Sequence, residues 1–323
     1  MTTNLRLVIP GLFEAHMLKT LVSDTKLLHQ QLLSKLKRAD QSEQDYSDIY
    51  QALYQLTPAH RQYVPWLIPS ELVDGRIAFR ADPVILQPTH NGILCRGNDI
   101  LHLDPDEQRD LEATFNDYFS ERGIELAFYS PSQAVVLIDS NNAELAQVEF
   151  SSLAEVLGQD LTHHLPKGDA GSEWQAILME TQMLLHRTET NQNRSETGEK
   201  TVGSLWFWGN NHTPEASLSL SVDTLFTDND LLKQVFSDKA HDLSSFNEVL
   251  SANGSVDIVI EQCELACLQN DPQRWQNAFD SVTREWILPA IEALQNKSIA
   301  QLEIVTETAQ YIYNPWHSMR FWR

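Results

Sequence analysis

The segment VDIVI at residues 256–260 is a near-continuous run of β-branched residues, which is typical of a parallel strand covered on both faces. Asp271 and Pro272 follow it as a capping residue and a proline at the first helical position, so a long helix is expected from there to Leu294. The chain returns to a short strand with LEIV at residues 302–305. A strand, a helix and a strand at this spacing predict a βαβ unit and therefore a parallel sheet.

The amino-terminal residues predict another strand of this sheet. Leu5 to Ile9 read as a short buried strand, which Pro10 and Gly11 end at the position where α/β proteins place their chemistry. From Arg76 onward the pattern changes to short strand-like runs separated by Gly, Pro and Asn, which indicates a domain boundary.

The stretch WQAILMETQMLLHRTETNQNRSETGEKTVGSLWFWGNN, residues 174–211, is the most informative about function. Its first part has helical periodicity, with an apolar face and a neighbouring stripe at i, i+3, i+4 and i+7. The members of this stripe are Met179, Gln182, Met183 and His186. Residues 188–200 contain no apolar side chain and include Gly198, so we expect a linker that crosses the surface.

The strand SLWFW at residues 204–208 closes this stretch. Because side chains alternate along a strand, Leu205 and Phe207 point to one face while Trp206 and Trp208 point to the other. The two indoles either belong to the core or stack against a ligand, and in both cases their N–H groups need acceptors.

Composition narrows the class of protein. The chain has 323 residues, of which 42% are hydrophobic, as expected of a globular protein with a substantial core. A formal net charge of −22 argues against binding to nucleic acid or to anionic membranes. No apolar run approaches the roughly 20 residues that span a bilayer, and the first residues do not resemble a signal peptide, so we expect a cytoplasmic protein. Three cysteines without a CxxC motif indicate neither a disulfide framework nor a zinc site.

Three motifs of this chain resemble a bacterial family of regulatory proteins of the RpfE type. They are RADPV at residues 80–84, QMLLH at 182–186 with Asn191 and Arg194 following, and SLWFWG at 204–209. That family is often labelled cofactor-independent phosphoglycerate mutase because it is similar to the archaeal-type enzyme. The archaeal-type enzymes have an R-x-N/D segment where Arg80 to Asp82 stand, and a W-L-W-G-Q-G segment where Trp206 to Asn210 stand.

The resemblance implies a fold and a domain order. The fold would be α/β, with an alkaline-phosphatase-like, three-layer α/β/α core formed by residues 1–75 and 203–323. An inserted, smaller α/β domain would occupy residues 76–202.

The resemblance also shows where the chemistry departs from the family. In that superfamily two divalent metal ions, held by Asp and His, polarise a phosphoryl group that a Ser or Thr alkoxide attacks. In this chain Glu264 stands where the family's ligand loop has its Asp, and Leu268 where it has its His. The family's P-D-H triplet is replaced by residues 307–309 (Glu-Thr-Ala). The Asp-Gly that ends its amino-terminal strand is replaced by Pro10-Gly11. Leu, Ala and Pro side chains cannot bind a metal, so we expect neither metal nor other cofactor.

Two functions follow as expectations. The first is a catalytically degenerate, phosphoglycerate-mutase-like protein that acts as a cytoplasmic regulatory or binding protein. The alternative is a metal-independent or residual phosphoryl-transfer enzyme, a mutase or phosphatase, acting on a small phosphorylated metabolite. Whether the protein is an enzyme stays open at this point, although the lost ligands favour the first function.

The candidate ligand-binding residues surround an anionic metabolite in this hypothesis. They are Arg80, Asp82, Gln182, His186, Asn191, Arg194, Trp206, Trp208 and Asn210. His186 would be the general acid or base and the arginines would clamp the anion. A purely structural alternative makes Arg80 and Asp82 an ion pair at a strand end and His186 an interior histidine. The aromatic carboxyl terminus, from Tyr311 to Trp322, would suit a protein partner.

Overall fold

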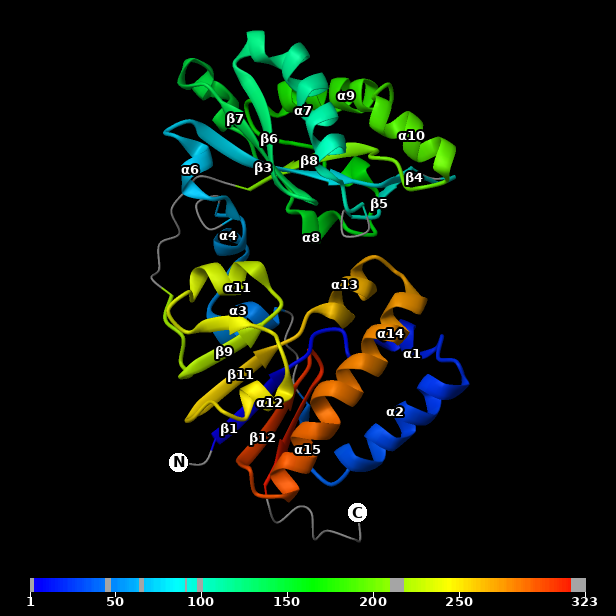
Figure 1. Cartoon of the computed structure of the whole chain (residues 1–323), viewed down its shortest axis with the longest axis vertical. Coiled ribbons are helices and arrows are strands. Elements are labelled where there is room, and N and C mark those ends of the chain that lie inside the picture. The colour runs from blue at the N-terminus through cyan, green and yellow to red at the C-terminus, as the bar shows by residue number, and fades with distance from the viewer. Residues whose placement is uncertain are drawn as a thin grey trace. The chain divides into compact units, whose positions relative to one another are not determined.

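The computed structural model describes residues 3–43, 48–63, 67–90, 92–97, 101–209 and 218–314. Contacts divide the chain into two compact units (Figure 1): unit 1 is Met1–Thr57 with Ala216–Arg323, and unit 2 is Pro58–Glu215. Compared with the insert expected at residues 76–202, unit 2 begins earlier and ends later. The later end follows from β8 (Ser204–Trp208), which pairs antiparallel with β3 (Ile77–Val84) inside unit 2.

Unit 1 is built on a seven-stranded sheet in the order β10-β9-β11-β1-β12-β13-β2. The first five strands are parallel, and β13 and β2 each run antiparallel to the strand before them. The strands are β1 (Thr3–Val8), β2 (Asp40–Glu43), β9 (Thr224–Thr227), β10 (Ala240–Asp242), β11 (Ser255–Val259), β12 (Ile299–Val305) and β13 (Ala309–Tyr313). The predicted βαβ unit is confirmed, with β1 lying between its two strands.

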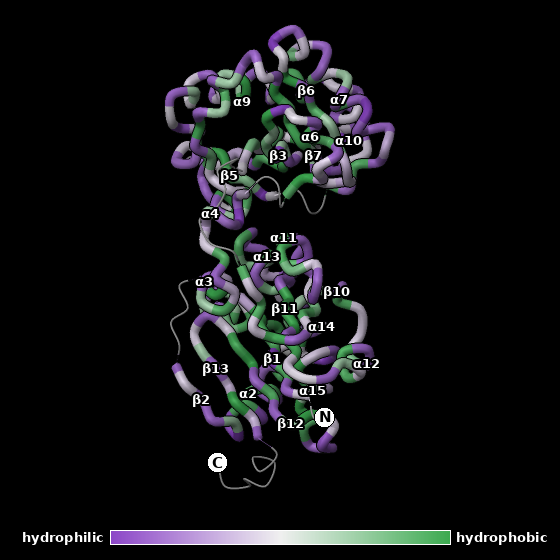
Figure 2. The backbone as a smooth tube through the Cα atoms, turned by 90° about the vertical axis from the view of Figure 1, so that its left-hand side faces the viewer, coloured by the Kyte–Doolittle hydropathy of each residue, from purple (hydrophilic) through white to green (hydrophobic). Residues whose placement is uncertain are grey.

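Helices cover both faces of this sheet. On one face α2, α14 and α15 pack against Leu7, Ile258 and Ile304, and on the other α3 and α11 pack against Val8 and Val259. The helices are α1 (Ala15–Leu18), α2 (Ser23–Leu36), α3 (Ile49–Tyr54), α11 (Asp230–Val235), α12 (Phe246–Val249), α13 (Gln262–Leu268), α14 (Pro272–Val282), η4 (Thr283–Ile287) and α15 (Leu288–Gln295). The three-layer α/β/α fold class expected from the sequence is therefore confirmed, and Figure 2 shows apolar segments in β1 and β11.

The long helix predicted after Asp271 is present, with one irregularity. A π-helical turn, η4, joins α14 to α15 just before Pro289. Proline lacks an N–H and its ring clashes with the preceding turn, so a wider turn lets the helix continue. Among the described helices, none combines the length and the apolar character needed to span a bilayer.

Unit 2 has an antiparallel sheet in the order β6-β7-β3-β8, with β6 (Ile124–Ser130) and β7 (Gln133–Ile138). Its other elements are α4 (Pro58–Arg61), α6 (Ser70–Val73), the hairpin β4 (Leu86–Pro88) and β5 (Ile93–Cys95), α7 (Pro105–Phe119), η1 (Ser120–Arg122), η2 (Ser140–Ala146), α8 (Leu153–Val156), η3 (Leu161–His163), α9 (Gly171–Leu185) and α10 (Glu189–Thr197). Trp174 of α9 anchors the core, since its ring centroid lies 5.7 Å from that of Phe79 and 5.0 Å from that of Phe207.

The linker expected after α9 is instead a helix, α10. Thr188 caps its first turn by accepting a hydrogen bond from the Asn191 N–H, and Gly198 ends it at φ +78°. These two capping residues explain how a segment without an apolar stripe forms a helix.

Candidate functional site

The carboxyl edge of the parallel strands in unit 1 is lined with acidic residues. Asp228 follows β9, Glu261 follows β11, Glu307 follows β12, and Glu264 lies in the first turn of α13. Open α/β sheets bind their ligands at this edge. This edge is therefore the expected position of a ligand or metal site in unit 1.

Tyr50 of α3 joins two of these carboxyl groups. Its Oη lies 2.5 Å from Glu261 Oε1 and 2.7 Å from Glu264 Oε2. A tyrosine hydroxyl has one proton, so it can donate a hydrogen bond to only one of the two carboxylates. In the other contact the hydroxyl oxygen is the acceptor, which requires a proton on that carboxyl group. Burial raises the pKa of Glu261 to about 7, which agrees with such a shared proton. The Asn229 amide also donates to Glu261.

The other two acidic side chains accept backbone hydrogen bonds. Glu307 Oε1 accepts from the Gly11 N–H at 2.6 Å, and Asp228 Oδ1 accepts from the Glu261 N–H at 3.0 Å. Burial raises the pKa of both carboxyl groups. Gly11 has φ +74°, and a Cβ there would lie 2.7 Å from the Glu264 nitrogen, so only glycine fits this turn.

This donor set does not fit the two divalent cations that the fold implies. Two-metal sites need several Asp and His ligands that converge on each ion. Over the described part of the chain, no group of three or more His, Cys, Asp or Glu side chains is arranged to hold a metal ion. The carboxylates of this edge instead accept hydrogen bonds from the Tyr50 hydroxyl, the Asn229 amide and the Gly11 N–H.

In unit 2, Arg80 and Asp82 form a buried ion pair on β3. The Arg80 Nη2 lies 2.7 and 2.9 Å from the two carboxylate oxygens, and Nη1 donates to the Leu67 carbonyl at 3.2 Å. Trp208 donates its Nε1–H to Asp82 at 2.8 Å, and its ring lies beside the guanidinium. Trp206 donates to the Ser151 carbonyl. Both indoles therefore have the acceptors expected of them. Arg80 and Asp82 form the ion pair of the structural alternative, but they lie within β3 and not at a strand end.

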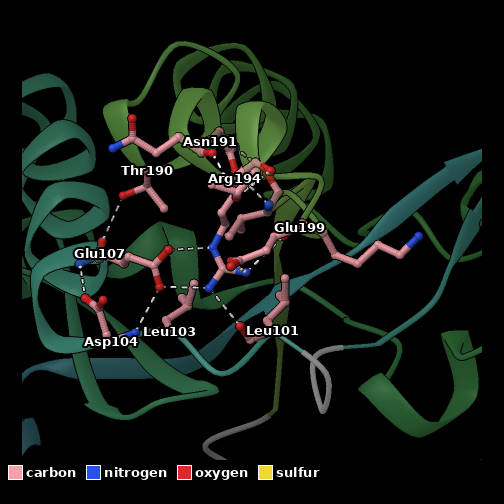
Figure 3. A network of polar contacts seen from close by, with 12 residues as sticks. Leu101, Leu103, Asp104, Glu107, Thr190, Asn191, Arg194 and Glu199 are labelled. Atoms are coloured by element: carbon pink, nitrogen blue, oxygen red, sulfur yellow. Dashed lines mark hydrogen bonds and ion pairs between the residues drawn. The ribbon is translucent and has the colours of Figure 1, made fainter.

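Arg194 is held by a separate network in the same unit (Figure 3). Its Nε and Nη2 donate to the two carboxylate oxygens of Glu107 at 2.6 and 2.7 Å. Nη2 also donates to the Leu101 carbonyl and Nη1 to the Lys200 carbonyl, at 2.8 and 3.0 Å. The two arginines thus bind protein acceptors in different networks, so the structure does not gather them around one anion.

The remaining candidates flank a groove between α9 and α10. Gln182 and His186 line a cavity of about 1170 Å³ beside Met179 and Met183, whose side chains are 63% and 64% exposed. Asn191 also lines it, although its amide is bonded to the Leu185 and Val202 carbonyls, both at 2.8 Å. Asn210 and the aromatic residues 315–323 lie outside the described residues.

Tyr50, Asp228 and Glu261 are not among the site residues predicted from the sequence. Tyr50 gave no signal, because a tyrosine on an amphipathic helix is ordinary core. The other two follow directly after strands, as Asp228 follows TLFT and Glu261 follows VDIVI. An acidic residue after each parallel strand is the pattern that would have found them.

Comparisons with known proteins agree with this fold. No protein-family model matches the chain. It is 24% identical over 144 residues to the probable 2,3-bisphosphoglycerate-independent phosphoglycerate mutase of Geobacter sulfurreducens, covering 45% of this chain and 35% of that protein. The corresponding mutase of Methanosarcina mazei is 24% identical over 151 residues, covering 46% of this chain and 37% of the relative.

A solved structure is similar in fold. The PH0037 protein from Pyrococcus horikoshii has a TM-score of 0.52 at 12% identity, covering 97% of this chain and 87% of that one. The chain thus has weak homology to cofactor-independent phosphoglycerate mutases and an alkaline-phosphatase-like fold. The matched segments span little more than a third of these curated relatives, 35% and 37%.

Proposed function

We propose that this protein is a catalytically degenerate relative of the phosphoglycerate mutases, of the RpfE-type regulatory kind, that acts in the cytoplasm as a binding or regulatory protein. The observation that carries the proposal is the Tyr50 hydroxyl between Glu261 and Glu264. Carboxyl groups that share protons with a tyrosine are poor ligands for a divalent cation, which binds the deprotonated form.

Metal analysis tests this proposal. Purified protein, treated with a chelator and dialysed, is titrated calorimetrically with Mn²⁺ and with Zn²⁺, and its mutase activity is assayed with 3-phosphoglycerate. We expect no stoichiometric binding and no turnover above a blank. Two bound ions per chain, or metal-dependent turnover, would show that the edge is an active two-metal site and that the alternative enzyme function holds.

We place the binding surface in the groove between α9 and α10, for a small anionic metabolite. Arg187 lines it and supplies positive charge, while His186 and Gln182 supply hydrogen-bonding groups. A thermal-shift screen of phosphorylated metabolites tests this placement. A stabilising compound should lose its effect in His186→Ala and keep it in His163→Ala, an exposed histidine of the same unit.

If both variants respond alike to that compound, the groove is not its site.

A protein partner for the aromatic carboxyl terminus is a separate proposal. Deleting residues 315–323 should abolish co-purification of that partner and leave metabolite binding unchanged.

A further inference from the structure

A second cavity lies in unit 1, whereas the α9–α10 groove belongs to unit 2. Its volume is about 660 Å³, within the range of roughly 300–1,000 Å³ that is usual for small-molecule sites. It is lined by Phe13, Leu18, His29, Leu33, Gln41, Glu43, Thr308, Ala309 and Tyr311. Phe13 lies in the chain after β1, and Thr308 in the chain after β12, so the cavity opens on the carboxyl side of the parallel strands.

Aromatic rings form much of its wall. The Phe13 ring centroid lies 6.2 Å from that of His29, at an interplanar angle of 59°, and 6.2 Å from that of Tyr311, at 72°. The negative faces of aromatic rings attract cations that come within about 6 Å. Burial lowers the pKa of His29, which disfavours the charged imidazole that would repel a cation.

The charge of the lining has one sign. Of the described residues that line this cavity, Glu43 is the one acidic side chain, and none is a lysine or an arginine. Glu43 lies on β2 opposite Ala309 of β13, and Gln41 lies opposite Tyr311. The carboxylate and the amide therefore belong to the strand that pairs with the strand of Tyr311. The net charge of −22 adds a general attraction for positive ligands.

We propose that this cavity binds a small organic cation, with an ammonium group between Glu43 and the rings of Phe13 and Tyr311 and an apolar or aromatic body against Leu18 and Leu33. Leu18 and Leu33 supply apolar surface for such a body, while Gln41 and Thr308 supply hydrogen-bond acceptors for the ammonium N–H groups. The site goes beyond the proposed function and does not depend on it, because it uses none of the Tyr50, Glu261 and Glu264 contacts and none of the α9–α10 groove.

Three probes of one shape but different charge test the proposal on the full chain. Phenethylamine is the cation, 2-phenylethanol its neutral analogue and phenylacetate the anion, and each is titrated calorimetrically at neutral pH. We expect the amine to bind at least about fivefold more tightly than the alcohol, the ratio that about 1 kcal/mol of charge interaction gives. The anion should bind more weakly than either. Equal affinities for all three, or binding of none at millimolar concentration, would overturn the proposal.

Two variants and a control locate the site. Glu43→Gln removes the charge at an exposed position and should weaken amine binding about fivefold without changing alcohol binding. Phe13→Leu keeps an apolar side chain but removes a ring, and should weaken amine binding about threefold. Glu285→Gln alters an exposed carboxylate of η4 in the same unit and should bind the amine as the unchanged protein does. Equal losses in Glu43→Gln and Glu285→Gln would show that the amine responds to net charge alone.

Discussion

Tyr50 and its two carboxyl partners show how single side chains can change what a sheet edge does. At this edge of the sheet the Tyr50 hydroxyl bridges Glu261 and Glu264. Without the shared protons these two half-buried carboxylates would repel each other, because like charges that are shielded from water interact strongly. The same contacts therefore stabilise the core and compete with any cation.

Glu261 makes the stability of the fold depend on pH. Its pKa is raised by burial from 4.5 to about 7, so the folded chain binds this proton more tightly than the unfolded chain does. The contribution is fully present below pH 4.5 and is lost as the pH rises to about 7, so the free energy of unfolding falls across that window. In thermal melts, the melting temperature of Glu261→Gln should rise relative to that of the unchanged protein as the pH rises. A parallel profile for the two proteins would contradict this, and Glu285→Gln serves as the exposed control.

Arg194 is a buried side chain whose loss should destabilise unit 2. It is 5% exposed and binds both oxygens of Glu107 together with two carbonyls, so truncation leaves a carboxylate and carbonyls without their donor. We expect Arg194→Ala to lower the free energy of unfolding by about 3 kcal/mol in urea titrations followed by tryptophan fluorescence. Arg109→Ala, which removes an exposed pair with Asp106, should cost at most about 1 kcal/mol. Equal losses in the two variants would mean that the Arg194 network adds nothing beyond a surface pair.

At the scale of elements, α10 depends on its ends. The helix has no apolar stripe, so its cap at Thr188 contributes to its stability beside the polar contacts of side chains such as Arg194. Thr188→Ala removes the bond to the Asn191 N–H and should cost about 1 kcal/mol. Ser195→Ala, at an exposed position within the same helix, should be neutral or slightly stabilising. Amide hydrogen exchange of residues 189–197 measures the stability of α10 in the two variants. Equal protection of these amides in Thr188→Ala and Ser195→Ala would show that the cap does not stabilise the helix.

The βαβ unit could be predicted from sequence because its signals are local: a β-branched run, a capped helix and a second strand. The alternating faces of β8 could be predicted for the same reason. The helix α10 could not be predicted from sequence, because helical periodicity is recognised from the spacing of apolar residues and α10 contains none. The Tyr50 cluster could not either, because Tyr50 and Glu261 are 211 residues apart and meet only once the sheet has formed.

For the whole molecule, the buried apolar residues define the domain limits better than the motifs do. One cluster draws its described members from residues 67–208, and two others draw theirs from the segments on either side of it. Unit 2 therefore has a core of its own, anchored by Trp174 and including β8.

A fragment of residues 58–215 should consequently fold alone, because its sheet keeps both partners of β3. We expect a near-ultraviolet circular dichroism signal from its buried indoles and one cooperative thermal transition. The matched control is a fragment of residues 76–202, the limits expected from the sequence, which lacks β8 and leaves one edge of β3 unpaired. An unpaired, apolar edge of this kind favours aggregation, so the shorter fragment should be insoluble or unfolded. If the shorter fragment folds as well as the longer one, β8 is not an integral strand of unit 2.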